Sequence, residues 1–296
     1  MSEFSIYDFN GSPYTYSFLR KLAAQYPKLS LVLYGRSVMG EPLLSATLGT
    51  GPRKVLFTAA HHGNEWLTCA VLLRFLEQFC LREDWQWVLE QNTLCFIPLV
   101  NPDGVDLVTG VLNSGPYFSE AVIISQNYPQ IPFTSGWKAN IQGIDLNLQY
   151  PARWEVAREL KFAAGYTSPA PRDFVGDYPL QAVEANTLAG FTRIFSPDAL
   201  LALHSQGQVI FYMFNGYAPE GTLPLARKMA EVSGYALSET PSYSDNAGYK
   251  DWFIQDFDRP GFTVEMGLGQ NPLPVSQFDE IYADCEPMFF VLATGV

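Results

Sequence analysis

Residues 55–60 form an apolar run within a predicted strand at 54–60, and a helical pattern follows that begins at Glu65 and extends to about Cys80. A short apolar run is typical of a buried strand, and a change to a 3.6-residue hydrophobic period indicates a helix. A buried strand that hands over at once to a helix is the repeating unit of α/β folds. The junction carries three polar residues that could take part in chemistry, namely His61, His62 and Glu65.

The same alternation of strands and helices continues along the chain. We expect helices at 14–26, 179–195, 219–233 and 276–292, and strands at 29–34, 42–48, 93–100, 199–204, 209–214 and 261–267. We expect two stretches rich in Gly, Pro, Ser and Asn to be irregular, 105–140 and 151–179. No linker or internal repeat divides the chain, so the pattern predicts a single α/β domain over residues 1–296, with a central mixed, mostly parallel sheet flanked by helices.

Composition narrows the classes of partner. The formal net charge of −12 disfavours nucleic acid, and no apolar run approaches the ~18 residues that span a membrane. The N-terminus shows no secretory pattern. Of the four cysteines, three lie in apolar patterns and none forms a CxxC pair. A reducing, cytoplasmic location is therefore expected, and the oligomeric state is left open.

Three polar residues could hold a catalytic zinc ion, which takes three protein ligands and leaves one position for water. His62 and Glu65 are three residues apart at a strand-to-helix junction and can point at one spot. His204 follows the apolar run 199–203 and is the third candidate, because the chain has only three histidines. His61 is the competing ligand, and its alternative is to pack beside the site. For His204 the alternative is a core histidine.

Glu265 is the candidate general base. It lies in a strand pattern, on the face opposite Phe262, Val264 and Met266. A carboxylate among apolar residues is costly without a partner or a function, and partial burial would raise its pKa toward the range useful for proton transfer. An ion pair or a solvent-facing glutamate is the alternative.

These residues together resemble the zinc carboxypeptidase (carboxypeptidase A) family: a His-x-x-Glu pair, a distant histidine and a glutamate in a Phe-Thr-x-Glu strand. The Asn-Pro-Asp-Gly turn at 101–104 and the segment 143–147 are also similar, and the resemblance extends from about residue 15 to the C-terminus. It implies a metallopeptidase that binds one Zn²⁺ ion through His62, Glu65 and His204.

The resemblance also implies roles for residues around the metal. Asp145 would orient His62, and Glu265 would be the base. Tyr243, eight residues before the Asp251-Trp252 pair, would close over the substrate.

Two positions depart from the family pattern. The chain has Asn147-Leu148 where the family usually has Asn-Arg, and Trp137-Lys138 where it often has Trp-Arg. Segments 137–140, 145–155 and 168–173 instead resemble a bacterial branch, the γ-D-glutamyl-meso-diaminopimelate peptidases of the endopeptidase I type. That resemblance implies a cell-wall (peptidoglycan) peptide as substrate, in the form of a small muropeptide.

Lys138 is a further catalytic candidate, and three residues are the candidates for binding that substrate. Lys138 would stabilise the oxyanion, and Asn147 with Arg172 would hold a carboxylate. Lys250 occupies the family's specificity position and would suit an acidic group. For Arg172 and Lys250 the alternative is an ordinary surface cation.

Three other functions remain open at this stage. They are an N-acyl-amino-acid deacylase of the aspartoacylase or succinylglutamate desuccinylase type, a general zinc carboxypeptidase, and a catalytically inactive binding module on the same fold.

Overall fold

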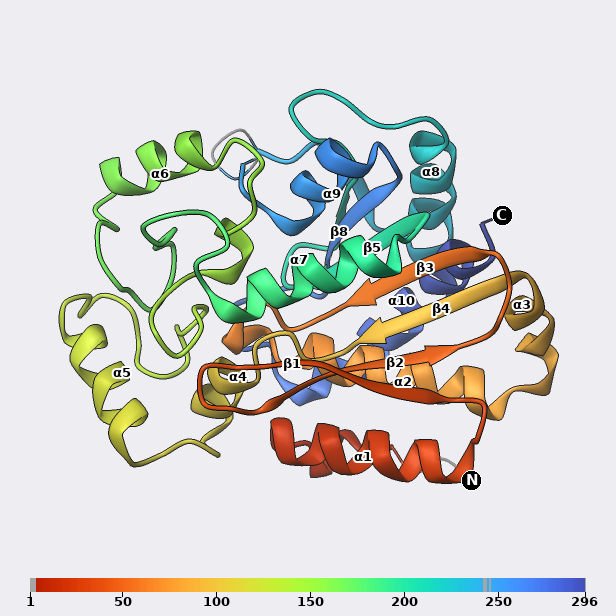
Figure 1. Ribbon diagram of the computed structural model, residues 1–296, viewed down its shortest axis with the longest axis horizontal. Helices are drawn as coiled ribbons and strands as arrows, with labels where there is room; N and C mark the ends of the chain where they lie inside the picture. The colour runs from red at the N-terminus through yellow and green to blue at the C-terminus, as the bar shows by residue number, and fades with distance from the viewer. Residues whose placement is uncertain (1–3, 242–243, 245, 296) are drawn as a thin grey trace.

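A computed structural model describes residues 4–241, 244 and 246–295, and an eight-stranded mixed sheet lies at its centre (Figure 1). In spatial order the strands are β1 (Ser30–Arg36), β2 (Pro42–Leu48), β4 (Asn92–Ile97), β3 (Arg53–Thr58), β5 (Ala199–His204), β8 (Gly261–Glu265), β6 (Val209–Phe211) and β7 (Ala236–Ser238). The four central strands β4, β3, β5 and β8 are mutually parallel, whereas the pairs β1/β2, β2/β4 and β6/β8 are antiparallel. The predicted α/β fold with a mixed, mostly parallel sheet is confirmed.

Helices cover both faces of this sheet, so alternate side chains of the central strands are buried on opposite sides. In β3, Phe57 belongs to one apolar cluster and Leu56 to the other. Four helices pack on the Phe57 side: α1 (Ser12–Gln25), α2 (Leu67–Leu81), α8 (Thr222–Ser233) and α10 (Phe278–Thr294). The Leu56 side is covered by α7 (Val183–Phe195), which crosses in front of the sheet in Figure 1, and by α9 (Tyr249–Phe257).

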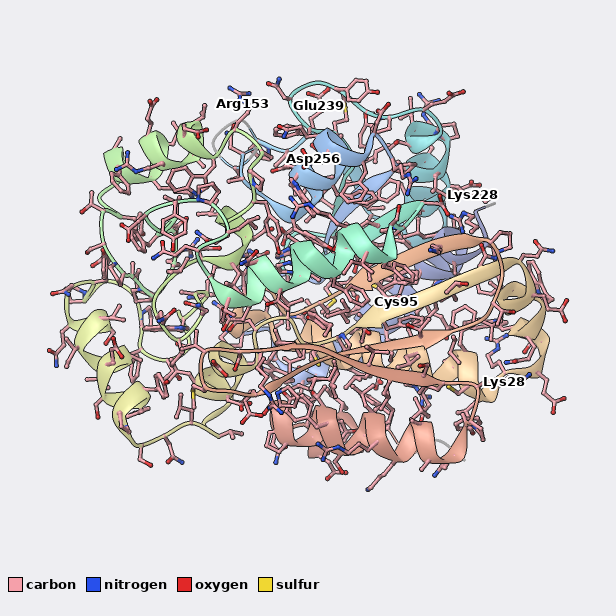
Figure 2. The ribbon with its side chains drawn as sticks, viewed as in Figure 1. Lys28, Cys95, Arg153, Lys228, Glu239 and Asp256 are labelled. Atoms are coloured by element: carbon pink, nitrogen blue, oxygen red, sulfur yellow. The ribbon has the colours of Figure 1, made fainter. Side chains whose placement is uncertain are left out.

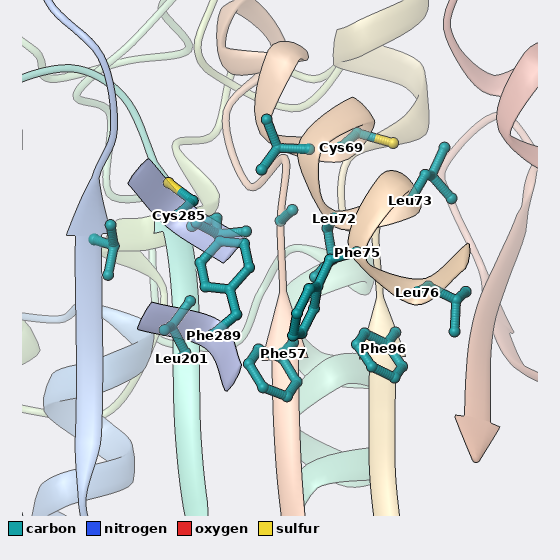
Figure 3. Packing of buried hydrophobic residues seen from close by; sticks show 14 of the residues in the cluster. Phe57, Cys69, Leu72, Leu73, Phe75, Leu76, Phe96, Leu201, Cys285 and Phe289 are labelled. Atoms are coloured by element: carbon teal, nitrogen blue, oxygen red, sulfur yellow. The ribbon is translucent and has the colours of Figure 1, made fainter. Parts of the chain in front are cut away.

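Aromatic packing fixes β3 between its neighbours. The Phe57 ring stacks on Phe96 of β4 at a centroid distance of 5.2 Å, and Phe75 of α2 meets Phe289 of α10 at 5.1 Å (Figure 3). All four rings are fully buried, and burying a side chain of this size contributes about 1.5–3 kcal/mol. Charged side chains such as Lys28 lie on the outside, while Cys95 is inside (Figure 2).

The segment between β4 and β5 corrects one prediction. It contains α4 (Pro102–Thr109), α5 (Pro116–Gln126) and α6 (Trp154–Ala163) in stretches expected to be irregular. Asn101 caps α4 by accepting a hydrogen bond from the Gly104 amide at 3.0 Å, and a proline stands in the first turn of both α4 and α5. Proline is favoured there because its missing N–H is not needed. The prolines that suggested irregular structure therefore mark the first turns of α4 and α5.

Several boundaries also differ from expectation. Two short elements, α3 (Gln86–Gln91) and β7, were not predicted, nor was α9, and β6 ends at Phe211. The four cysteines are free thiols. In the part of the chain that the structure describes, no helix is long and apolar enough to cross a membrane.

Candidate active site

The candidate residues lie where the central parallel strands end. His62 follows β3 in an extended conformation, Glu65 closes the 3₁₀ turn Gly63–Glu65, and His204 is the last residue of β5. Glu265 ends β8 directly beside His204 in the strand register. Because parallel strands end at the same edge, residues far apart in the chain meet there.

A close backbone approach holds the 3₁₀ turn in place. A Cβ atom on Gly63 would lie 2.5 Å from the carbonyl oxygen of Gly104 in α4, so only glycine fits. The Gly63 and Asn64 amides donate hydrogen bonds to the carbonyls of Lys138 and Trp137. The turn that carries Glu65 is therefore fixed against two neighbouring segments.

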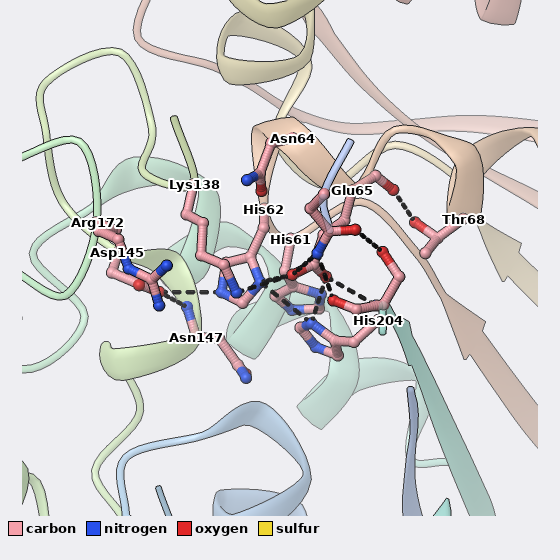
Figure 4. Close-up of polar contacts among 12 residues, drawn as sticks. His61, His62, Asn64, Glu65, Thr68, Lys138, Asp145, Asn147, Arg172 and His204 are labelled. Carbon is pink, nitrogen blue, oxygen red and sulfur yellow. Dashed lines mark hydrogen bonds and ion pairs between the residues drawn. The ribbon is translucent and has the colours of Figure 1, made fainter. Parts of the chain in front are cut away.

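Two histidines and a glutamate converge in the buried centre of this edge (Figure 4). The His62 Nδ1 atom lies 2.9 Å from Glu65 Oε1, the His204 Nδ1 atom lies 3.0 Å from Glu65 Oε2, and the two Nδ1 atoms are 3.3 Å apart. Tetrahedral ligands with zinc bonds of about 2.1 Å are roughly 3.4 Å from one another. The chemistry and spacing of this donor set therefore fit a zinc ion.

Asp145 lies behind His62. Its Oδ1 atom is 3.1 Å from His62 Nε2, and it also accepts a hydrogen bond from the Asn147 amide at 3.2 Å. Burial favours the neutral form of Asp145, but the neighbouring His62 outweighs it and holds the pKa of the carboxyl well below its usual range. Burial likewise lowers the pKa of His62, yet Glu65 and Asp145 raise it to about 9. The surroundings of His62 therefore favour a positive charge, which a zinc ion bound to the neutral imidazole would supply.

Two further candidates face the same centre. Burial and the charge of Glu65 raise the pKa of the Glu265 carboxyl. The Lys138 Nζ atom donates to Glu65 Oε1 at 2.9 Å. Burial lowers the pKa of Lys138, but Glu65 outweighs this and raises it, so Lys138 carries a full positive charge.

A cavity of about 550 Å³ opens beside these residues. Among the described residues, the charged side chains that line it are three cations, Lys138, Arg172 and Lys250, and two acids, Asp251 and Glu265. A chain with a net charge of −12 thus places three cations at this cavity, each ion-paired with a neighbouring acid.

The predicted substrate-binding residues differ in how they are held. Arg172 donates through Nε to Asp173 at 2.5 Å, and its side chain is 41% exposed. Lys250 is almost fully buried, and its ammonium contacts the Met213 carbonyl, the Thr240 hydroxyl and the Asp251 carboxylate. An ammonium has three donors, so Lys250 is already held by acceptors of the protein itself.

The remaining candidates have separate places. Asn147 lines the cavity and accepts a hydrogen bond from the Tyr249 amide at 3.0 Å. His61 packs beside the site, with Nε2 3.3 Å from the Tyr150 hydroxyl and its ring 5.5 Å from that of His204. Tyr243 falls outside the described residues.

Two residues at the site were not singled out from the sequence. The Ser205 amide donates to Glu65 Oε2 at 3.1 Å, and Asn271 pairs with Ser205 across the cavity wall. The available signals were weak: Ser205 directly follows His204, and Asn271 stands in a Gly-rich turn six residues after Glu265.

Comparison with known proteins agrees with this geometry. Residues 15–286 match the family model described as zinc carboxypeptidase. Over 284 residues the chain is 40% identical to gamma-D-glutamyl-L-diamino acid endopeptidase 1 of Lysinibacillus sphaericus. The aligned stretch covers 92% of this chain and 69% of that protein.

Two solved structures share the fold. Bovine thrombin-activatable fibrinolysis inhibitor, in complex with tick carboxypeptidase inhibitor, superposes with a TM-score of 0.74 at 17% identity over 98% of both chains. The murein-tripeptide amidase MpaA of Escherichia coli O157 superposes with a TM-score of 0.57 at 20% identity, covering 90% of this chain and 92% of that one.

Proposed function

The chain belongs to the zinc carboxypeptidase family and is a zinc metallopeptidase, and we propose that it cuts a small bacterial cell-wall peptide at the bond between γ-D-Glu and meso-diaminopimelate. In this proposal residues 1–296 act as one catalytic domain with one zinc ion. The related Lysinibacillus enzyme is named for hydrolysis of a γ-D-glutamyl-diamino acid bond, which supports this substrate class.

The cations around the cavity carry the proposal. Lys138 and Arg172 face a space of about 550 Å³ beside the His-Glu-His cluster, in a chain whose net charge is −12. A γ-linked D-glutamate keeps a free α-carboxylate next to the bond that is cut, and diaminopimelate adds carboxylates of its own. Cations close to the reacting bond suit such a substrate better than an ordinary peptide.

In the proposed mechanism His62, Glu65 and His204 hold the zinc ion, and Asp145 keeps His62 oriented. When bound, zinc polarises the amide carbonyl and lowers the pKa of its water to about 7. The Glu265 carboxylate accepts a proton from the attacking water and passes it to the leaving amine.

The other cavity residues would act on the substrate directly. The Lys138 ammonium would donate to the carbonyl oxygen as that oxygen gains negative charge. Asn147 and Arg172 would hold a substrate carboxylate, and Tyr243 would close over the bound peptide. Lys250, whose three donors are held by acceptors of the protein, would favour an acidic group through its charge rather than by direct contact.

The test is incubation of the zinc-loaded protein with L-Ala-γ-D-Glu-meso-diaminopimelate, with mass spectrometry of the products. We expect free meso-diaminopimelate, and we expect Arg172→Ala to raise KM more than it lowers kcat. Peptides with ordinary C-terminal residues, N-acetylaspartate and N-succinylglutamate serve as comparison substrates. Release of ordinary C-terminal residues, with this bond left intact, would contradict the cell-wall assignment and favour a general carboxypeptidase; deacylation of the last two would favour a deacylase.

A further inference from the structure

The loop after β8 returns to the metal cluster through one side chain, Asn271. Its Nδ2 atom donates to the Ser205 carbonyl at 2.6 Å, and its Oδ1 atom accepts a hydrogen bond from the Ser205 hydroxyl at 2.8 Å. Two hydrogen bonds between one carboxamide and one residue fix both the position and the rotation of that residue. The residue they fix is the one directly after His204.

Ser205 in turn contacts the glutamate of the cluster. Its amide donates to Glu65 Oε2 at 3.1 Å, while the Asn271 Nδ2 atom lies 3.5 Å from Glu65 Oε1. A carboxylate has about four acceptor positions. With the Lys138 ammonium on Oε1, three of them are occupied by donors from outside the cluster and one is left for a metal. The terminal torsion of a glutamate is broad and weakly restricted, and donors from outside the cluster are therefore needed to hold one orientation.

Asn271 lies on the cavity wall and is only partly buried, yet its hydrogen bonds within the described part of the chain go to Ser205 and Glu65. We propose that Asn271 is a positioning residue of the metal centre, which aligns the Glu65 carboxylate and the His204-Ser205 segment for a divalent cation. This inference rests on the proposed function, in which His62, Glu65 and His204 bind zinc. The competing explanation is that Asn271 only ties the loop at 266–275 to the body of the protein.

Zinc affinity separates these explanations, because a simple tie stabilises the fold without changing how the cluster binds metal. We would measure the zinc dissociation constant by competition with a chromophoric chelator, and the melting temperature of each metal-free protein. The proteins are the wild type, Asn271→Ala, Ser205→Ala and Gln270→Ala. Gln270 is the matched control, since it lines the same cavity and no contact with Ser205 or Glu65 is seen for it in the part of the chain described here.

Loss of an outer partner of a metal ligand costs 10–100-fold in metal affinity. We expect Asn271→Ala to bind zinc about tenfold more weakly and Ser205→Ala, which loses a single hydrogen bond, about threefold more weakly. Gln270→Ala should match the wild type. The visible spectrum of the cobalt(II)-loaded Asn271→Ala protein should differ from that of the wild type, because the ligand geometry has changed.

A folded Asn271→Ala protein with wild-type zinc affinity and cobalt spectrum would overturn the inference, and a lowered melting temperature alone would indicate the simple tie. If Asn271→Ala does not fold, Ser205→Ala decides, and unchanged zinc affinity in that variant overturns the inference. Failure of the wild type to bind zinc would instead refute the proposed metal centre itself.

Discussion

At the scale of single residues, the pKa values of Glu265 and Glu65 are shifted in opposite directions although both side chains lie in the same site. Glu65 is surrounded by His62, His204 and Lys138, which hold its pKa well below the usual range despite its burial. Glu265 meets burial and the charge of Glu65, which raise its pKa. Two carboxylates whose pKa values are pushed apart suit two roles, a permanently charged ligand and a proton acceptor.

Glu265→Gln should therefore remove the base while leaving the metal in place, since Glu265 is not one of the three converging donors. We expect turnover of the tripeptide to fall by about 10²–10⁴-fold, with zinc content by mass spectrometry unchanged. Near-wild-type turnover in this variant would show that Glu265 is not the base.

Asp145→Asn tests the support behind His62. The amide keeps the size of the side chain but removes the negative charge 3.1 Å from His62 Nε2. We expect zinc affinity to fall by roughly 10–100-fold, measured by chelator competition. Asp173→Asn is the matched control, because Asp173 contacts Lys161 and Arg172 rather than His62, and its zinc affinity should stay at the wild-type value. Equal zinc affinity for Asp145→Asn and the wild type would remove Asp145 from the metal centre.

At the scale of elements, Asp103 in the first turn of α4 ties that helix to the turn between β1 and β2. Its carboxylate accepts hydrogen bonds from the Ser37 hydroxyl at 2.7 Å and the Met39 amide at 2.9 Å. The side chain is fully buried, and burial raises its pKa from 3.8 to about 7.

This shift predicts a pH dependence of stability. Between the two pKa values the folded protein keeps a proton that the unfolded chain releases, so the free energy of unfolding should fall as the pH rises toward 7. The contribution of one group has a limiting slope of about 1.4 kcal/mol per pH unit. We would measure the free energy of unfolding by urea titration at several pH values between 4.5 and 8. Plotted against pH, this free energy should fall less steeply for Asp103→Asn than for the wild type. Parallel curves would mean that Asp103 is charged in both states.

How far the sequence predicted the elements depended on their burial. Residues 199–204 were predicted with the observed bounds of β5, because all six side chains are buried and the apolar run has sharp ends. The helices α4 and α5 were missed, because capping residues and first-turn prolines resemble loop composition when tertiary contacts are unknown. The helix α6, which has no first-turn proline, was missed as well. The Asn101-Pro102 pair was a cap signal that could have located α4.

The site residues also differed in how far the sequence alone could predict them. The sequence brought His62, Glu65 and His204 together, because strand ends, spacing and the scarcity of histidine all indicated the same edge. Asn271 and Ser205 are 66 residues apart and pair through an irregular loop, for which no periodic pattern exists. The sequence also could not show that the Lys250 ammonium is held by acceptors of the protein itself, because those contacts exist only in the folded structure.

At the scale of the whole molecule, the charge distribution is uneven. The net charge is −12, whereas the described residues that line the cavity include three cations. The His-Glu-His cluster is buried and lies beside this cavity, next to the lining residues Asn64 and Ser205. A ligand in the cavity would therefore meet cations close to the cluster, which suits an anionic group.

The buried cluster also links metal binding to the stability of the whole chain. The three ligands come from the turn after β3 and from the last residue of β5, which meet only when the sheet is formed. Zinc should therefore bind the folded state and not the unfolded one. Binding of this kind stabilises the folded state by about 2.7 kcal/mol when free zinc is 100 times its dissociation constant. Removal of zinc with a chelator should lower the melting temperature and abolish hydrolysis, and zinc should restore both. Magnesium should not, because it prefers oxygen ligands in octahedral geometry. If the metal-free protein melts at the same temperature and retains full activity, the His-Glu-His cluster is not the centre of the reaction.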